Sequence, residues 1–236
     1  MKSQTIHKSN RGRPVLPVET ILHRILFVLS EGCSWRAIDS PQANWNSIYH
    51  YWRRWCRDGV WTQLLDDCAP ELKGGRRFLD STHVKVHRSG SNPAGGQENQ
   101  AMGRTKGGLN TKIHAVVDEA GSPAGLLLGA GPEADISRAQ ETLADVPCGQ
   151  LVGDKGYDSD AFRQWLAGRS IKPCIPPRSN RLRPVRYSKA SYRKRHLIEN
   201  FFEKLKRFRR VATRYDKLTT TYFGFVCLAT AVSFTK

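Results

Sequence analysis

Residues 190–211 constrain the fold most, because they predict one long helix with two chemically different faces. At the helical period of about 100° per residue, four apolar side chains fall on one stripe. They are Leu197, Phe201, Leu205 and Phe208. The nearly opposite face carries four polar side chains, Tyr192, Arg195, Glu199 and Lys206. This helix is therefore expected to pack on a larger structure through its stripe and to present one carboxylate among cations.

Glu199 has a simple interpretation, an exposed pair with Arg195 that stabilises the helix by about 0.3 to 0.5 kcal/mol. The surrounding charge favours a second interpretation, because residues 178–217 contain 15 Lys or Arg against three acids. The whole chain of 236 residues has a formal charge of +17 and a pI near 10.0. Such charge requires a polyanionic partner, and lysines and arginines that neutralise phosphates dominate affinity for nucleic acids. A folded nucleic-acid-binding protein is expected.

Composition excludes other classes of protein. The six cysteines include no C-x-x-C pair and no clustered histidines, so neither a zinc site nor a disulfide framework is indicated. The first residues lack the apolar segment of a secretory signal. The longest apolar run, residues 222–234, is too short to span a bilayer and predicts a buried core helix. A cytosolic protein with reduced thiols and no membrane contact is expected.

The N-terminal part, residues 1–73, predicts a basic arm at 1–17 followed by a small all-helical unit. One helix begins near Val18 and closes at Gly32, and a short helix follows Ser34. A further helix places Tyr51, Trp52 and Trp55 on one face and Arg53 and Arg54 on another. This pattern is compatible with helix-turn-helix binding of DNA, although Trp and Tyr at helical spacing are more often core residues than base-stacking groups.

Residues 74–236 follow after a Gly74–Gly75 linker and predict an α/β domain, a mixed sheet flanked by helices. Alternating residues predict a strand at 78–86, and a hairpin is expected from 112–118 and 124–128. Further strands are expected at 150–154 and 171–175. Helices are predicted at 133–146 and 160–167 in addition to the long helix.

Three carboxylates stand out within this pattern. Asp80 interrupts an apolar strand, Asp154 ends another strand, and Glu199 lies on the long helix. Singly, each has an ordinary explanation as a turn former, a cap or an ion pair. Together they match the few carboxylates with which hard cations such as Mg²⁺ are bound in two-metal phosphoryl transfer.

Several motifs resemble insertion-sequence transposases of the D-D-E class, most closely the insertion-sequence-five group. Phe78-Leu-Asp-Ser-Thr is similar to the first-Asp motif, and Gly153-Asp-Lys-Gly-Tyr-Asp-Ser is similar to the second. Residues 104–118 between them also resemble this family. The most specific motif is Tyr, two residues, Arg, three residues, Glu, six residues, Lys. Here it comprises Tyr192, Arg195, Glu199 and Lys206.

The resemblance implies a ribonuclease H-like catalytic domain and a DNA transposase that cleaves element ends and joins the freed 3′-OH to target DNA. Asp80, Asp154 and Glu199 would be the catalytic residues and would hold two Mg²⁺ or Mn²⁺ ions. Expected partners are double-stranded DNA and a second subunit in a homodimer on paired ends, in the bacterial cytoplasm at the nucleoid. The candidate DNA-binding residues are Tyr192, Arg195, Lys206, Lys155, Arg104, Lys106, Arg53 and Arg54.

Two alternatives stay open on the sequence. Only ten residues precede the Arg11-Gly-Arg-Pro segment, where the family usually has some tens, so the chain is alternatively a truncated, catalytically silent copy that regulates by binding DNA. The presence of all three carboxylates argues against this. A general nuclease of similar fold would differ by cleaving any duplex regardless of sequence.

Overall fold

The computed structural model describes residues 16–68, 74–183 and 185–234, so most of the predicted basic arm at 1–17 lies outside the described residues. The predicted helical unit is confirmed. Gly32 closes its first helix in the left-handed conformation with φ of 64°. A helix that the sequence patterns did not predict, α3, completes the unit. Its elements are α1 (Val18–Glu31), η1 (Trp35–Ile38), α2 (Trp45–Arg57) and α3 (Val60–Cys68).

A mixed sheet follows, as predicted. β3 (Gly108–Val117) lies between β1 (Arg76–Val86) and β4 (Pro123–Ala130) and runs antiparallel to both. β3 and β4 form the expected hairpin. On the other side of β1, β5 (Gln150–Val152) and then β6 (Lys172–Cys174) run parallel to it. The short strands β2 (Gly103–Thr105) and β7 (Thr213–Arg214) pair with β3 and β1.

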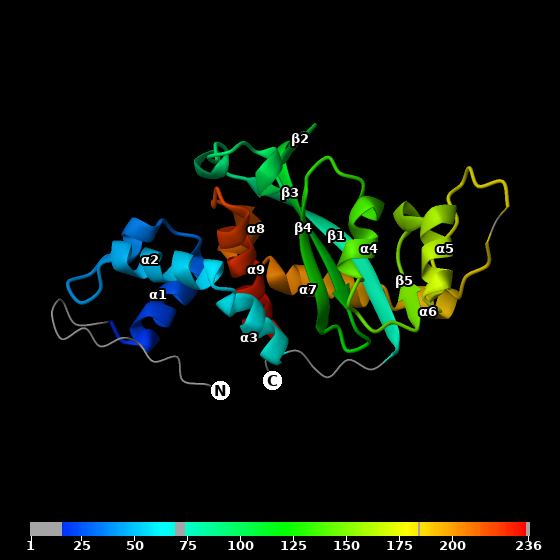
Figure 1. Cartoon of the computed structure of the whole chain (residues 1–236), viewed down its shortest axis with the longest axis horizontal. Helices are drawn as coiled ribbons and strands as arrows, with labels where there is room; N and C mark the ends of the chain where they lie inside the picture. The colour runs from blue at the N-terminus through cyan, green and yellow to red at the C-terminus, as the bar shows by residue number, and fades with distance from the viewer. Residues whose placement is uncertain (1–15, 69–73, 184, 235–236) are drawn as a thin grey trace.

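Helices cover both faces of this sheet (Figure 1). One core joins a face of β1 and β3 to the helical unit, α7 and α9, and a second core joins the opposite face to α4 and α5. Phe78 enters the first core and its neighbour Leu79 the second, as strand alternation requires. The helical segments of this part are η2 (Arg88–Gly90), η3 (Glu98–Gln100), η4 (Asp135–Arg138), α4 (Ala139–Thr142), η5 (Lys155–Tyr157), α5 (Asp160–Gly168), α6 (Lys189–Arg193), α7 (His196–Leu205), α8 (Arg209–Ala212) and α9 (Thr219–Phe234).

Two helix predictions were wrong in extent. The segment 190–211 is three helices, α6, α7 and α8, instead of one. At Lys194 and Arg195 the backbone N–H groups bond three residues back, and Phe208 takes an extended conformation. The second break lets α8 turn onto α1, where Val211 is buried, so tertiary packing overrides the helical period. The helix predicted at 133–146 is only η4 and the single turn of α4.

The core helix predicted at 222–234 is confirmed as α9, which is apolar on all sides and packs between the helical unit and the sheet (Figure 1). Trp52 of α2 stacks on Phe225 of α9 with ring centroids 4.0 Å apart. Within the part of the chain that is described, no helix is long and apolar enough to cross a membrane. Because one core spans both parts, the boundary at residue 73 stays a prediction.

Candidate active site

Asp80 lies on the central strand β1, two residues beyond the part of β1 that pairs in parallel with β5. Its side chain is 15% exposed, and its Oδ1 accepts a hydrogen bond from the Ser81 N–H at 2.8 Å. Burial raises the pKa of Asp80 above its usual value, and the Arg195 guanidinium offsets part of this effect. A half-buried carboxylate of this kind requires a cation beside it.

Asp154 is brought to Asp80 by strand register. Phe78 pairs with Val152 in the parallel β1–β5 ladder, and each aspartate lies two residues beyond its member of that pair. Asp154 caps η5 by accepting the Gly156 N–H at 2.8 Å, and a Cβ on Gly156 would lie equally close to the same carboxylate oxygen. The charge of Asp154 contributes to the raised pKa of Asp80, as expected for neighbouring carboxylates.

Glu199 is joined to this pair through Arg195. The Arg195 Nη1 donates to Glu199 Oε1 and Nη2 donates to Asp80 Oδ2, each at 2.5 Å. Burial opposes the charge of Arg195, but Asp80 and Glu199 outweigh it, so the pKa of Arg195 is raised. Phe201 and Leu205 of the predicted stripe are buried and dock α7 on the core, together with Ile198 and Phe202, which the stripe did not include. Leu197 and Phe208 pack only at the margin of this core.

The other two residues of the motif flank Arg195 and Glu199, with Tyr192 on the preceding helix α6 and Lys206 at the end of α7, the helix that carries Glu199. Lys206 ends α7 and donates to Thr82 Oγ1 at 2.6 Å and to the His83 carbonyl at 3.1 Å, and partial burial lowers its pKa. Tyr192 of α6 is half-buried and meets the Tyr187 ring edge-on. Burial raises the pKa of Tyr192, and Arg195 opposes that shift.

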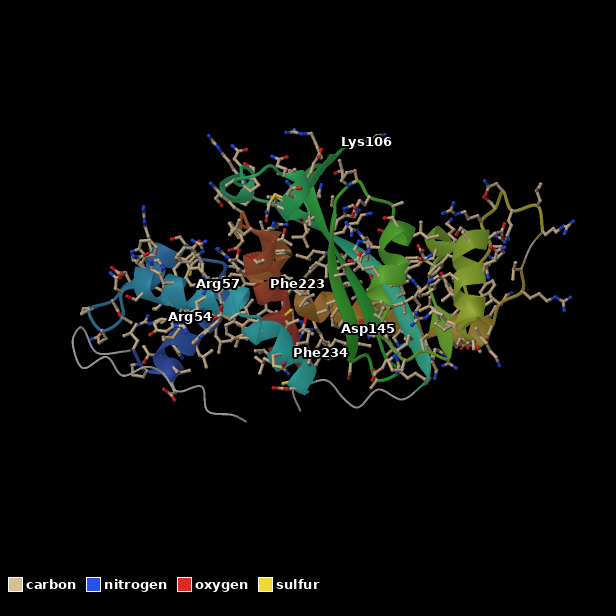
Figure 2. All side chains as sticks on the ribbon, viewed as in Figure 1. Arg54, Arg57, Lys106, Asp145, Phe223 and Phe234 are labelled. Carbon is tan, nitrogen blue, oxygen red and sulfur yellow. The ribbon has the colours of Figure 1, made fainter. Side chains whose placement is uncertain are left out.

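The other predicted DNA-binding residues are not gathered at this point. Lys155 is exposed directly after Asp154, whereas Arg104 lies on β2 and Lys106 on the turn to β3. Arg53 and Arg54 are exposed on α2. Figure 2 shows Lys106 at an outer tip and Arg54 on the helical unit, in separate parts of the molecule. The tertiary structure thus brings Tyr192 and Arg195 to the acids, whereas Lys206 contacts Thr82 and His83 of β1 and Lys155 is the sequence neighbour of Asp154.

Sequence reasoning missed a polar network behind Asp80. Ser81 donates to Asp135 Oδ1 at 2.6 Å, and Lys112 donates to the same oxygen at 2.7 Å. Burial acts to raise the pKa of Asp135, but the Lys112 and Ser81 hydrogen bonds outweigh it and the pKa is lowered. A charged Lys112 inside an otherwise apolar hairpin strand was the available signal. Such a buried ammonium requires an oxygen partner, which the partly exposed Asp135 supplies.

The donor set suits a hard divalent cation, since the three acids offer only carboxylate oxygens. Among the described residues, no group of three or more His, Cys, Asp or Glu is gathered closely enough to hold a metal ion. Arg195 stands between two of the three acids instead. The side chains therefore fit such an ion by chemistry, with a guanidinium as their present cationic partner.

A model of the transposase DDE domain matches residues 72–234. The chain belongs to the transposase DDE-domain family. A second model, describing transposases of the IS4/5 family, matches residues 3–65. A Brucella ovis protein named as a transposase for insertion sequence element IS6501 is 37% identical over 130 residues, which are 52% of this chain and 97% of that protein. The predicted family is thereby confirmed.

Solved transposase structures are similar at low identity. The piggyBac transposase synaptic complex with hairpin DNA is 10% identical with a TM-score of 0.48, covering 96% of this chain and 67% of that one. A pre-cleavage Mos1 transpososome is 12% identical with a TM-score of 0.29, covering 96% and 81%. The fold prediction is confirmed by the sheet itself, with three antiparallel strands, then two parallel ones, and helices on both faces.

Family membership confirms the predicted function as a DNA transposase and does not favour the alternative of a silent regulator. Family membership also confirms the prediction that the chain belongs to a class of enzymes, the DDE transposases.

Proposed function

We propose that this transposase cleaves DNA at the ends of an insertion sequence and joins the freed 3′-OH to target DNA, with Asp80, Asp154 and Glu199 as its catalytic acids. The observation that carries the proposal is the β1–β5 register, which places Asp80 beside Asp154, together with the Arg195 bridge from Asp80 to Glu199. Three acids far apart in sequence are thereby connected, Asp154 through the strand register and Glu199 through Arg195.

Each step forms one P–O bond and breaks another. In the first, water attacks a phosphorus atom at the element end, and the 3′-oxygen leaves as a hydroxyl and a 5′-phosphate remains. In the second, this hydroxyl attacks a phosphodiester of the target, the target's own 3′-oxygen leaves, and no covalent intermediate with the protein is needed. Mg²⁺ or Mn²⁺ ions, two in this proposal, held by the three acids would lower the pKa of the attacking group and stabilise charge on the leaving oxygen.

The protein's own contribution is to position these acids. The Ser81 N–H and the surrounding burial orient the Asp80 carboxylate, and the Gly156 N–H orients that of Asp154. Glu199 is aimed by the docking of α7 through Phe201 and by the Lys206 contact with β1. Pre-organised acids of this kind reduce the entropic cost of reaching the transition state.

DNA would approach over the cations near the acids and continue towards the helical unit. Tyr192, Arg195, Lys206 and Lys155 are proposed to contact the strand that reacts, and Arg104 and Lys106 the flanking backbone. On the helical unit, Arg53 and Arg54 line a cleft of about 480 Å³ between α2 and the start of α9. Residues 1–73 would thus bind DNA, and residues 74–236 would catalyse cleavage and strand transfer. A homodimer would hold the two paired ends.

The test is cleavage and strand transfer of labelled element-end DNA with Mg²⁺ or Mn²⁺, using a scrambled end as control. Asp154→Asn is compared with Asp145→Asn, which makes the same change at an exposed aspartate (labelled in Figure 2). The proposal expects cutting confined to the true end, lost in Asp154→Asn and kept in Asp145→Asn. Cleavage that ignores end sequence would instead identify a general nuclease, and equal activity of both variants would remove Asp154 from the mechanism.

A further inference from the structure

Arg195 is the cation that two of the proposed catalytic acids share. Its guanidinium bonds Asp80 and Glu199 through separate nitrogens, each at 2.5 Å. The Arg195 side chain is 21% exposed, Asp80 is 15% exposed and Glu199 is 56% exposed. The guanidinium thus sits at the solvent boundary of the acid cluster, where an incoming ion or DNA strand can reach it.

The charges of this arrangement are not balanced. One positive charge faces Asp80 and Glu199, and Asp154 adds a third carboxylate that acts on Arg195 from nearby. A divalent ion neutralises this set better than a single guanidinium does, and carboxylate oxygens are its preferred ligands. Arg195 and such an ion therefore compete for the same oxygens.

The hydrogen bonding of Arg195 is also incomplete. Its Nε is buried and has no partner among the described residues. A buried donor left unpaired costs free energy. A different conformation of the Arg195 side chain, in which every guanidinium N–H is paired, would therefore be favourable. A DNA phosphate offers that position, because arginine binds phosphate oxygens through two parallel N–H groups.

We propose that Arg195 is an exchangeable counter-cation, which leaves Asp80 and Glu199 when a divalent ion binds them and then contacts a DNA phosphate. This inference rests on the proposed function, since it assigns a metal and a DNA strand to the same acids. It gives Arg195 a positioning role that couples the two ligands. Because such coupling is reciprocal, DNA that captures Arg195 also raises the affinity of the acids for the ion.

The first experiment measures Mn²⁺ binding to the whole chain without DNA, by the electron paramagnetic resonance of the free ion. Arg195→Gln is compared with Arg193→Gln, which removes the same charge from an exposed position on the neighbouring turn. Exchange predicts that Arg195→Gln binds Mn²⁺ about tenfold more tightly than the Arg193→Gln control, a typical size for coupled sites.

The second experiment measures the salt dependence of binding to a short duplex of unrelated sequence, with Mn²⁺ and with a chelator. Each lost phosphate contact lowers the slope of log K against log salt by about one. Exchange predicts this loss for Arg195→Gln in Mn²⁺ and almost no loss in the chelator. Arg193→Gln should behave alike in both conditions.

Two results would overturn the inference. One is Mn²⁺ affinity in Arg195→Gln that is no higher than in Arg193→Gln, and the other is a salt-slope loss that is the same with and without the ion. If circular dichroism shows that Arg195→Gln is unfolded, Arg195→Lys must show the same changes at smaller size, because an ammonium lacks the forked donors. Neither readout uses cleavage, so failure of the transposition assay is distinguishable from failure of the exchange.

Discussion

Lys206 at the end of α7 donates a 2.6 Å hydrogen bond to Thr82 Oγ1, two residues along β1 from Asp80. The helix that carries Glu199 is thereby tied to the strand that carries Asp80. The contact is exposed, so its effect on global stability is small, yet it bears on the distance between two acids.

Replacing Lys206 by Gln is expected to lower strand cleavage at least about tenfold, because small misplacements of reacting groups cost large factors in rate. Stability should change by less than about 1 kcal/mol, as for exposed charged contacts generally. Urea unfolding and cleavage assays check the two quantities. The matched control is Lys204→Gln, which removes an exposed cation from the same helix. Equal cleavage by the two variants would contradict the positioning role.

Asp158 holds the loop that follows Asp154. Its buried carboxylate accepts hydrogen bonds from the Arg163 and Arg181 side chains and from the Arg178 N–H. Burial acts to raise its pKa, but these bonds outweigh burial and lower it. Asp158→Asn should destabilise the fold by about 3 to 5 kcal/mol, since it removes a buried carboxylate charge that pairs with both Arg163 and Arg181. Thermal unfolding should show a lower melting temperature for Asp158→Asn and an unchanged one for the control Asp145→Asn. Equal shifts in both variants would count against the role of Asp158.

Gly224 marks the close approach of α9 to the helical unit. A Cβ at this position would lie 2.6 Å from Cys56 Sγ and 3.0 Å from a Trp61 ring carbon. Gly224→Ala should therefore cost about 1 to 3 kcal/mol through overpacking. Gly168→Ala is the control, since nothing would lie within 4 Å of a Cβ at this last residue of α5 and the change should leave stability within about 0.5 kcal/mol. Denaturant midpoints that move together in both variants would contradict the close approach.

His114 predicts a dependence of stability on pH. It is fully buried, neither ring nitrogen has a partner among the described residues, and burial lowers its pKa to about 4. Between pH 6.5 and 4 the unfolded chain binds a proton that the folded chain does not, so stability falls as pH falls through this window. The loss at the acid end is about 3 kcal/mol.

The measurement compares urea unfolding of wild type, His114→Gln and the exposed-site control His196→Gln at several pH values. His114→Gln should lose less stability on acidification than the other two, because it removes the titrating group. Parallel curves for all three proteins would show that His114 titrates normally.

The sequence alone determined the family, five of the sheet strands, β1, β3, β4, β5 and β6, and the local setting of each acid, on a strand for Asp80, after the end of a strand for Asp154 and on a helix for Glu199. These follow from short-range patterns: residue alternation in β1, the apolar run of α9 and the spacing within the Tyr-Arg-Glu-Lys motif. Period alone, however, predicted one helix over 190–211, where burial of Val211 against α1 required a break.

Only the tertiary structure decided which side chains meet. The Arg195–Glu199 pair follows from local helical spacing, but the β1–β5 register that places Asp80 beside Asp154 and the docking of α7 that brings Arg195 to Asp80 join distant segments, and no local pattern encodes them. The partners of Lys112 were likewise set by the fold, because a buried ammonium donates hydrogen bonds to whichever oxygen atoms the packing brings within reach. Local preferences decide the elements, whereas burial and pairing of charges over the whole chain decide the site.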